Sequence, residues 1–155
     1  MNQPILFNSQ IRDDVQFGTN VKVVQPVNLY GCELGNDCFI GPFVEIQKDV
    51  KIGQRTKIQS HSFICELVTI GDDCFIGHGV MFINDVFDNG GPARGDKSKW
   101  KSTVIANNVS IGSNATILPI TICANVVIGA GAVVTKNITA PGIYAGNPAK
   151  LVRTL

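Results

Sequence analysis

The feature that most constrains this chain is a large apolar residue that recurs every six positions. The series runs unbroken through Leu34, Ile40, Ile46, Ile52, Ile58, Ile64, Ile70, Ile76 and Phe82. A period of six fits neither an α-helix, which repeats every 3.6 residues, nor a long strand, which alternates every two. It is typical of short strands joined by corners, with three strands in a coil of about 18 residues and the coils stacked through backbone hydrogen bonds.

Two further positions repeat with the same period. Glycine directly follows the apolar residue at Gly35, Gly41, Gly53, Gly71 and Gly77. Small or β-branched residues stand four positions after it, at Cys38, Val44, Val50, Thr56, Ser62, Val68, Cys74 and Val80. We expect the large side chains to fill a triangular interior and the small ones to fit its corners, where glycine tolerates unusual backbone angles.

The repeat extends in both directions with irregularities. It begins at Val15, Val21 and Val27, with one extra residue before Leu34. It resumes at Ile105, Ile111 and Ile117 and, after one missing residue, continues at Ile122, Ile128 and Val134. The sequence therefore predicts one all-β solenoid domain over residues 1–155, with about six coils, an excursion loop at about 84–103 and a C-terminal cap at about 137–155. A short helix is expected at the very end.

Composition excludes several classes of protein. The 155 residues carry a formal net charge of +1, which is not the strongly basic charge typical of nucleic-acid-binding proteins. No apolar run reaches the roughly 18 residues of a membrane helix, and the first residues lack the features of a signal peptide. The five cysteines form no C-x-x-C pair, and an odd number fits reduced thiols. These features predict a soluble cytoplasmic protein.

The repeats, the segment "IGAGAVVTK" from Ile128 and the segment "AGNPAK" from Ala145 resemble the hexapeptide-repeat acyltransferases. "QPVNLYG", "IGPFVEIQ", "QSHSFI" and "IGHGVMFIND" are similar to the N-acetyltransferases that act on 3-amino sugars attached to UDP or dTDP. The resemblance implies a left-handed parallel β-helix and a homotrimer with active sites between neighbouring prisms. It also implies transfer of an acetyl group from acetyl-CoA, without a metal, to the amino group of a nucleotide-linked sugar. A convex prism has no cleft of its own, which agrees with a site between copies.

The candidate catalytic residues lie near the excursion. Asn84 and Asp85 stand where the repeat gives way to the loop, and in the resembled enzymes an asparagine at this place contacts the acceptor amine. The alternative is an asparagine that only begins a turn. His78 should face outward and could accept the proton of the attacking amine. His61, on the preceding coil, should lie close to His78. The alternatives are two surface histidines, or proton transfer to the leaving thiolate.

Other candidates surround this centre. A backbone N–H near Gly77 or Gly79 is expected to stabilise the oxyanion. The candidate CoA-binding residues are Gly129, Ala130, Gly131, Ala132, Lys136, Lys150 and Arg153. The candidate substrate-binding residues are Asn28, Tyr30, Glu33, Arg94 and Trp100. Each basic residue could equally be a solvated surface charge.

Three other functions compete with this interpretation. A carbonic anhydrase on the same scaffold needs three histidine ligands for zinc, and the chain has two histidines. The acceptor could carry a hydroxyl instead of an amine, or the β-helix could be a non-catalytic binding scaffold. A nucleophilic cysteine is not expected, because Cys38 and Cys74 occupy inner corner positions.

Overall fold

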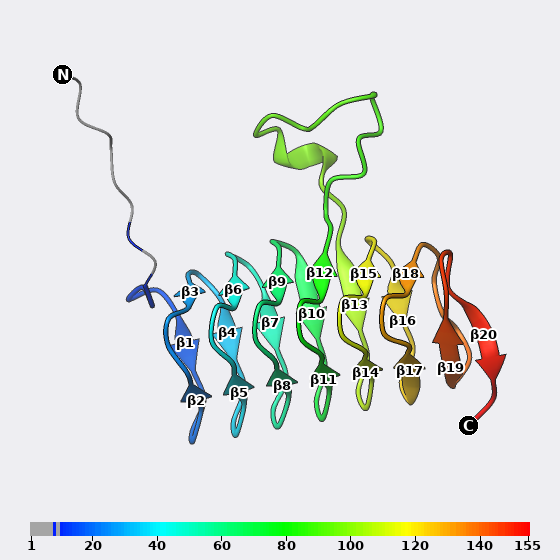
Figure 1. The fold of residues 1–155 in the computed structure, drawn as a ribbon. Helices are drawn as coiled ribbons and strands as arrows, with labels where there is room; N and C mark the ends of the chain where they lie inside the picture. Colours follow the sequence, from blue (N-terminus) through cyan, green and yellow to red (C-terminus); the bar gives the residue numbers. More distant parts are fainter. Residues whose placement is uncertain (1–7, 9) are drawn as a thin grey trace.

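The structure, a computed structural model, describes Asn8 and residues 10–155, and these residues form a left-handed parallel β-helix (Figure 1). Sheet 1 contains β1 (Gln16–Phe17), β4 (Glu33–Leu34), β7 (Lys51–Ile52), β10 (Val68–Ile70), β13 (Thr103–Ile105) and β16 (Thr121–Ile122). Sheet 2 contains β2 (Lys22–Val23), β5 (Phe39–Ile40), β8 (Lys57–Ile58), β11 (Phe75–Ile76), β14 (Ser110–Ile111), β17 (Val126–Ile128), β19 (Gly142–Ala145) and β20 (Lys150–Arg153). Sheet 3 contains β3 (Asn28–Leu29), β6 (Glu45–Ile46), β9 (Phe63–Ile64), β12 (Met81–Phe82), β15 (Thr116–Ile117) and β18 (Val133–Val134).

The repeat of six sets the register of these sheets. Each strand pairs in parallel with the strand one coil later, so that Ile40 lies opposite Ile58 and Ile58 opposite Ile76. The second residue of a two-residue strand points inward, and from Leu34 to Phe82 all of these residues are buried. Stacked aliphatic side chains therefore form one continuous core along the axis. The small corner residues from Cys38 to Val80 are also buried, which confirms their predicted place.

The predicted frame of the first coil is wrong. Its inward residues are Phe17, Val23 and Leu29, which pair with the inward residues of the next coil. Val15, Val21 and Val27 stand instead at the small corner position. The spacing before Leu34 is therefore one residue short, not one residue long. Valine fits both positions, which is why the sequence pattern misassigned it.

The glycines that follow the inward residues serve close packing. A Cβ built on Gly53 would lie 2.4 Å from the backbone carbon of Gly71 in the next coil, and the φ angle of Gly53 is not left-handed. The left-handed position lies two residues later, where asparagine and aspartate predominate, as at Asp37, Asp49, Asp73, Asn108, Asn114 and Asn125. At this corner position four larger residues also adopt the left-handed conformation, namely Phe43, Arg55, His61 and Leu67.

The C-terminal segment ends in strands, so the expected short final helix is wrong. Strand β19 continues sheet 2 parallel to β17, and β20 turns back antiparallel to β19. This strand pair covers the last coil at the C-terminal end of the prism (Figure 1). The segment forms a strand and not a helix because the backbone of β17 offers a free sheet edge with which it can pair. Across Asn8 and residues 10–155, no helix is long and apolar enough to cross a membrane.

Candidate active site

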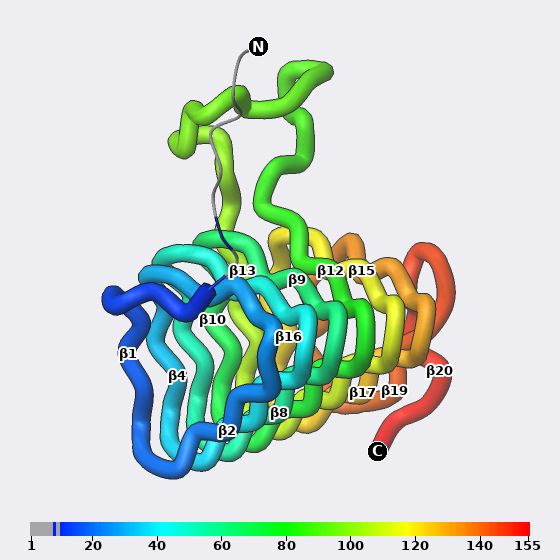
Figure 2. The backbone as a smooth tube through the Cα atoms, turned by 60° about the vertical axis from the view of Figure 1, so that its left-hand side comes forward, coloured from blue at the N-terminus to red at the C-terminus, as the bar shows by residue number. Residues whose placement is uncertain are grey.

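The candidate catalytic residues lie along two edges that flank sheet 3. The 2–3 edge consists of the corners between sheets 2 and 3, and the 3–1 edge consists of the corners between sheets 3 and 1. The loop of residues 83–102 leaves the 3–1 edge between β12 and β13 and projects from the prism (Figure 2). Its one helical turn is η1 (Lys97–Lys99). The loop thus gives a convex column a concave element.

Asn84 joins the two ends of the loop to the coil beneath it. Its side-chain Nδ2 donates to the backbone oxygen of Glu66 at 3.2 Å, and its own backbone oxygen accepts from the N–H of Lys101 at 2.9 Å. The side chain is half-buried, so its amide oxygen lies at the base of the loop with no hydrogen-bond donor within the described chain. That oxygen can accept a hydrogen bond from a ligand.

Asp85 is used by the loop itself. Its two carboxylate oxygens accept from the N–H of Ala93 at 2.7 Å and from the N–H of Phe87 at 3.0 Å. These bonds fold the first half of the loop back on its stem. The geometry therefore supports a positioning role for Asp85.

We expect Asp85→Ala to expose the loop to proteolysis. Two hydrogen bonds are lost at about 1 kcal/mol each, so tryptic cleavage at Arg94 and the lysines that follow should become about 30-fold faster. The matched control is Asp88→Ala, which removes only the exposed ion pair with Lys101 and should leave cleavage within about twofold. Cleavage is followed by mass spectrometry. Equal rates in the two variants would contradict this role for Asp85.

Glu66 is a site residue that the sequence analysis missed. Its side chain is only 13% exposed, and both of its oxygens accept from Nζ of Lys97, at 2.6 and 2.9 Å. The backbone N–H of Glu66 donates to Oε1 of Gln47 at 3.3 Å, and Nε2 of Gln47 donates to Glu45 at 3.0 Å. The available signal was spacing, because Glu66 precedes Asn84 by one coil of 18 residues.

Tyr30 continues this polar row on the 3–1 edge. Its hydroxyl lies 3.4 Å from Oε1 of Glu45 and donates to it. Burial raises the pKa of the Tyr30 phenol, and the nearby Glu45 carboxylate raises it further. The hydroxyl therefore remains a hydrogen-bond donor at neutral pH.

His78 lies on the 2–3 edge, at the corner between β11 and β12. Its Nδ1 lies 2.8 Å from the hydroxyl of Ser60, which stands one coil earlier. The ring is exposed, so Nε2 is open to a ligand. When Nδ1 carries the proton and donates to Ser60, Nε2 is the basic nitrogen. Because Asn84 occupies the opposite edge of sheet 3, one chain does not bring His78 and Asn84 together.

His61 lies on the coil before His78, as expected, but it contacts a different group. Its ring stacks on Phe43 with the ring centroids 4.8 Å apart and an angle of 18° between the planes. Ser60, not His61, is the hydrogen-bonding partner of His78. The two histidines thus share an edge without forming a pair.

The expected oxyanion donor, a backbone N–H near Gly77 or Gly79, is not the N–H of either glycine. The N–H of Gly77 donates to the carbonyl of Ile111 at 2.8 Å, and the N–H of Gly79 donates to the carbonyl of Ser60 at 3.0 Å. Both are consumed by coil stacking. The N–H of His78, between them, has no hydrogen-bond acceptor in the part of the chain that the structure describes.

A row of such N–H groups follows the 2–3 edge. Those of Ser60, His78, Ser113 and Ala130 all lack an acceptor among the described residues. At three corners between sheets 1 and 2, those of Thr19, Gln54 and Asp72, the equivalent N–H group is capped by a side chain. The N–H of Gln54 donates to Asp72 at 3.0 Å, for example, and that of Asp72 donates to Asn107 at 2.9 Å. The 2–3 edge therefore presents free backbone donors to a ligand.

The expected CoA-binding residues divide between two places. Gly129, Ala130, Gly131 and Ala132 form the 2–3 edge of the last coil, and Gly131 is exposed with φ at 68° and open space around it. The "AGNPAK" segment crosses the end of this edge, where the carbonyl of Gly146 accepts from the N–H of Val133 at 3.0 Å. The basic residues are all exposed, with Lys136 after β18 and Lys150 and Arg153 on β20.

The expected substrate-binding residues are dispersed. Asn28 faces outward on sheet 3, but Glu33 faces outward on sheet 1, where it pairs with Lys51 at 3.2 Å. Trp100 lies at the base of the loop with its ring centroid 5.3 Å from Nζ of Lys97. Arg94 lies at an exposed part of the loop. Trp100 is thus tied to Glu66 through Lys97, whereas Glu33 lies on a different face.

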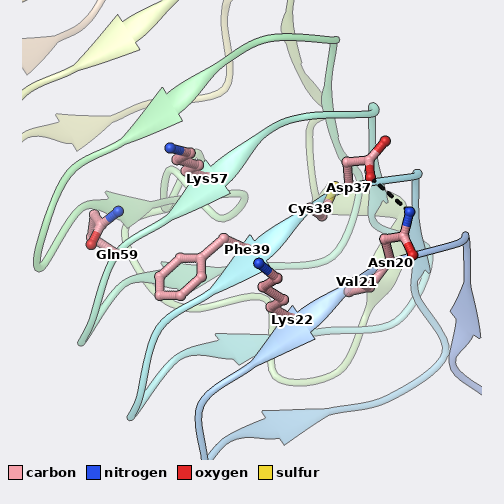
Figure 3. Close-up of a pocket in the computed structure, with 8 residues that line it drawn as sticks. All are labelled: Asn20, Val21, Lys22, Asp37, Cys38, Phe39, Lys57 and Gln59. Atoms are coloured by element: carbon pink, nitrogen blue, oxygen red, sulfur yellow. Dashed lines mark hydrogen bonds between the residues drawn. The ribbon is translucent and has the colours of Figure 1, made fainter.

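Two hollows border these edges. A hollow of about 470 Å³ lies under the loop stem and is mainly apolar; Phe63, Phe82, Ile83, Asn84, Asp85, Val86, Phe87 and Leu118 line it. A wider, open groove of about 770 Å³ runs over sheet 2, where Lys22, Phe39 and Lys57 stand in register (Figure 3). The first contains Asn84 and Asp85, whereas the second contains none of the candidate residues.

The buried cysteines are unsuited to nucleophilic catalysis. Burial raises the pKa of the Cys32 thiol to about 11 and that of the Cys65 thiol to about 12. At neutral pH these groups are thiols, which are far less reactive than thiolates. No group of three or more potential ligands for a metal ion gathers within Asn8 and residues 10–155.

Two family models and several known proteins match this chain. The family model described as bacterial transferase hexapeptide (six repeats) matches residues 31–66. The model described as hexapeptide repeat of succinyl-transferase matches residues 67–81 and 103–136. The bifunctional protein GlmU from Streptococcus uberis is 35% identical over 124 residues, which are 79% of this chain and 24% of GlmU. The chain thus spans about a quarter of the length of that relative.

Two solved structures are similar to most of the chain. One is a hexapeptide-repeat acetyltransferase from Vibrio cholerae O1 biovar eltor, complexed with acetyl-CoA. It has 27% identity and a TM-score of 0.68, with 81% of this chain and 72% of that chain covered. The other is a variant of AntD, an N-acyltransferase from Bacillus cereus, in complex with dTDP and CoA. It has a TM-score of 0.79 and 90% and 82% coverage, and at 23% identity it shows the fold alone.

The two family models together match more than half of the chain, and their repeats coincide with the coils of the structure. The chain therefore belongs to the hexapeptide-repeat acyltransferase family.

Proposed function

We propose that this protein transfers an acetyl group from acetyl-CoA to the amino group of a dTDP- or UDP-linked amino sugar. The observation that carries the proposal is the amide of Asn84, held at the base of the loop by its hydrogen bond to the backbone carbonyl of Glu66. The free amide oxygen accepts a hydrogen bond from the N–H of an amine that enters as the free base, with its lone pair available for attack.

The 2–3 edge supports the binding of acetyl-CoA. Its row of free N–H groups suits the amide carbonyls of the pantetheine arm, and the small residues Gly129 to Ala132 permit close approach. Lys136, Lys150 and Arg153 would then meet the phosphates of CoA. The similar acetyltransferase from Vibrio cholerae is complexed with acetyl-CoA, which agrees with this assignment.

The separation of the edges supports a site between copies. His78 and Asn84 flank sheet 3 on opposite sides, so one chain cannot close both around a single acceptor. In a homotrimer, the 2–3 edge of one copy would face the loop and 3–1 edge of the next. Neither copy would then hold a complete site alone.

The proposed reaction is direct attack. The amine nitrogen forms a bond to the thioester carbonyl carbon, and the oxyanion accepts a hydrogen bond from the N–H of His78. The carbon–sulfur bond then breaks and the electron pair leaves with CoA as a thiolate. The ammonium proton passes to Nε2 of His78 or to the thiolate. The free cysteines of the chain, and a reaction between acetyl-CoA and a nucleotide-linked sugar, fit a protein of the cytoplasm.

The test is an acceptor panel. The purified protein is supplied with acetyl-CoA and a series of UDP- and dTDP-amino sugars, and both free thiol and the amide product are quantified. One thiol released for each amide formed supports the proposal. Ester formation on a hydroxyl acceptor would instead identify an O-acetyltransferase. No turnover together with no acetyl-CoA binding by calorimetry would leave a non-catalytic scaffold.

A further inference from the structure

The 2–3 edge carries an aromatic stack that the proposed reaction leaves unexplained. Phe43 and His61 occupy equivalent corners of consecutive coils, with ring centroids 4.8 Å apart and an angle of 18° between the planes. Phe43 is 57% exposed, so one face of the stack is open to solvent. Exposing a phenyl ring to water is unfavourable unless something covers it.

Both residues adopt a backbone conformation that their side chains disfavour. The φ angle is 60° at Phe43 and 63° at His61, in the left-handed region that bulky residues rarely enter. Most other corners place asparagine, aspartate or glycine there, as at Asp49 and Asn114, and the remaining exceptions, Arg55 and Leu67, lie on the other two edges. Two adjacent exceptions on one edge indicate that the rings serve a purpose other than the fold, because strained conformations cluster at functional sites.

The stack lies in line with the proposed reaction centre. Gly79, beside His78, occupies the equivalent corner one coil beyond His61, and the carbonyl of Ser60 accepts from the N–H of Gly79 at 3.0 Å. Two coils separate Phe43 from Gly79, which is about 10 Å at the spacing of paired strands. The candidate CoA residues Gly129 to Ala132 lie on the same edge in the opposite direction.

We propose that Phe43, backed by His61, is the stacking platform for the nucleobase of the acceptor. This proposal rests on the proposed function and specifies which end of the edge the nucleotide occupies. A flat apolar ring suits a base and not a phosphate. The stacked base belongs to the acceptor and not to CoA, because the acetyl donor would occupy the coils on the far side of His78.

The test uses a substitution that fits the left-handed backbone conformation at position 43. Phe43→Asn removes the ring and installs a residue that the left-handed corner accepts, so the fold is retained. Its kcat/KM for the nucleotide-linked amino sugar should fall about tenfold through KM, since stacking on an aromatic ring contributes substantially to base binding. The KM for acetyl-CoA should stay within about twofold. Phe43→Trp should retain the wild-type KM for the acceptor.

Two controls separate the platform from other roles. Phe75→Asn makes the same change at another exposed phenylalanine, on sheet 2, and should leave the acceptor KM unchanged. With the amino sugar 1-phosphate, which has no base, wild type and Phe43→Asn should have the same KM. Calorimetry with dTDP and UDP measures base binding without catalysis, so an inactive wild type would count against the proposed function while the platform is still tested.

Three outcomes would overturn the platform. One is unchanged dTDP and UDP affinity in Phe43→Asn. Another is an effect confined to acetyl-CoA, which would place the adenine of CoA on the ring. The third is loss of the wild-type oligomeric state in light scattering, which would make Phe43 a contact between copies.

Discussion

Phe82→Ala is expected to lower the free energy of unfolding by about 3–5 kcal/mol. Phe82 is 1% exposed and ends β12, where the loop departs. Its inward partner in the next coil is Ile117, and the hollow under the loop lies beside it. Truncation leaves a cavity that the stacked strands cannot collapse into, because their backbones are fixed by hydrogen bonds on both sides.

The matched control is Met81→Ala on the same strand. Met81 faces outward and is 41% exposed, so its loss should cost about 1 kcal/mol or less. Both variants are measured by urea unfolding monitored by circular dichroism. A repeat column transmits destabilisation mainly to neighbouring coils, so the slope with denaturant is checked as well. Equal losses in the two variants would mean that Phe82 is not a core residue.

The period of six fixed most of the fold in advance because each inward residue has the same environment. The series from Leu34 to Phe82 and the missing residue before Ile122 coincide with the strand register. The first coil was misassigned because Val15, Val21 and Val27 suit the inner corner as well as a strand. The terminal strand pair was missed because pairing with β17 is a tertiary contact that local propensity does not report.

The sequence predicted the site less well than the fold. The period located Asn84 and His78 at corners but did not reveal that these corners flank sheet 3 on opposite edges. Glu66 was missed because a single glutamate in a coil resembles a surface residue; its spacing of 18 residues from Asn84 was the sequence signal, and its contact with Lys97, 31 positions away, is visible only in the structure. The free N–H of His78 is likewise visible only when the partners of Gly77 and Gly79 are known.

Asn84→Ala is expected to lower kcat/KM for the acceptor about 100-fold while acetyl-CoA binding is retained. The variant keeps the backbone bond from Lys101 but loses the side-chain bond to the carbonyl of Glu66 and the amide oxygen proposed to hold the amine. A small misplacement of a nucleophile can cost about that factor. Asn89→Ala, an exposed asparagine of the same loop, should retain the wild-type rate.

His78→Ala, measured in parallel, determines which group takes the proton. If Nε2 of His78 is the base, its loss should lower kcat about 100-fold or more. If the thiolate takes the proton, His78→Ala should have a much smaller effect and Asn84→Ala should remain the more damaging change. Near-native rates in both variants would contradict both assignments, because the reaction would then need neither the amide of Asn84 nor the imidazole of His78.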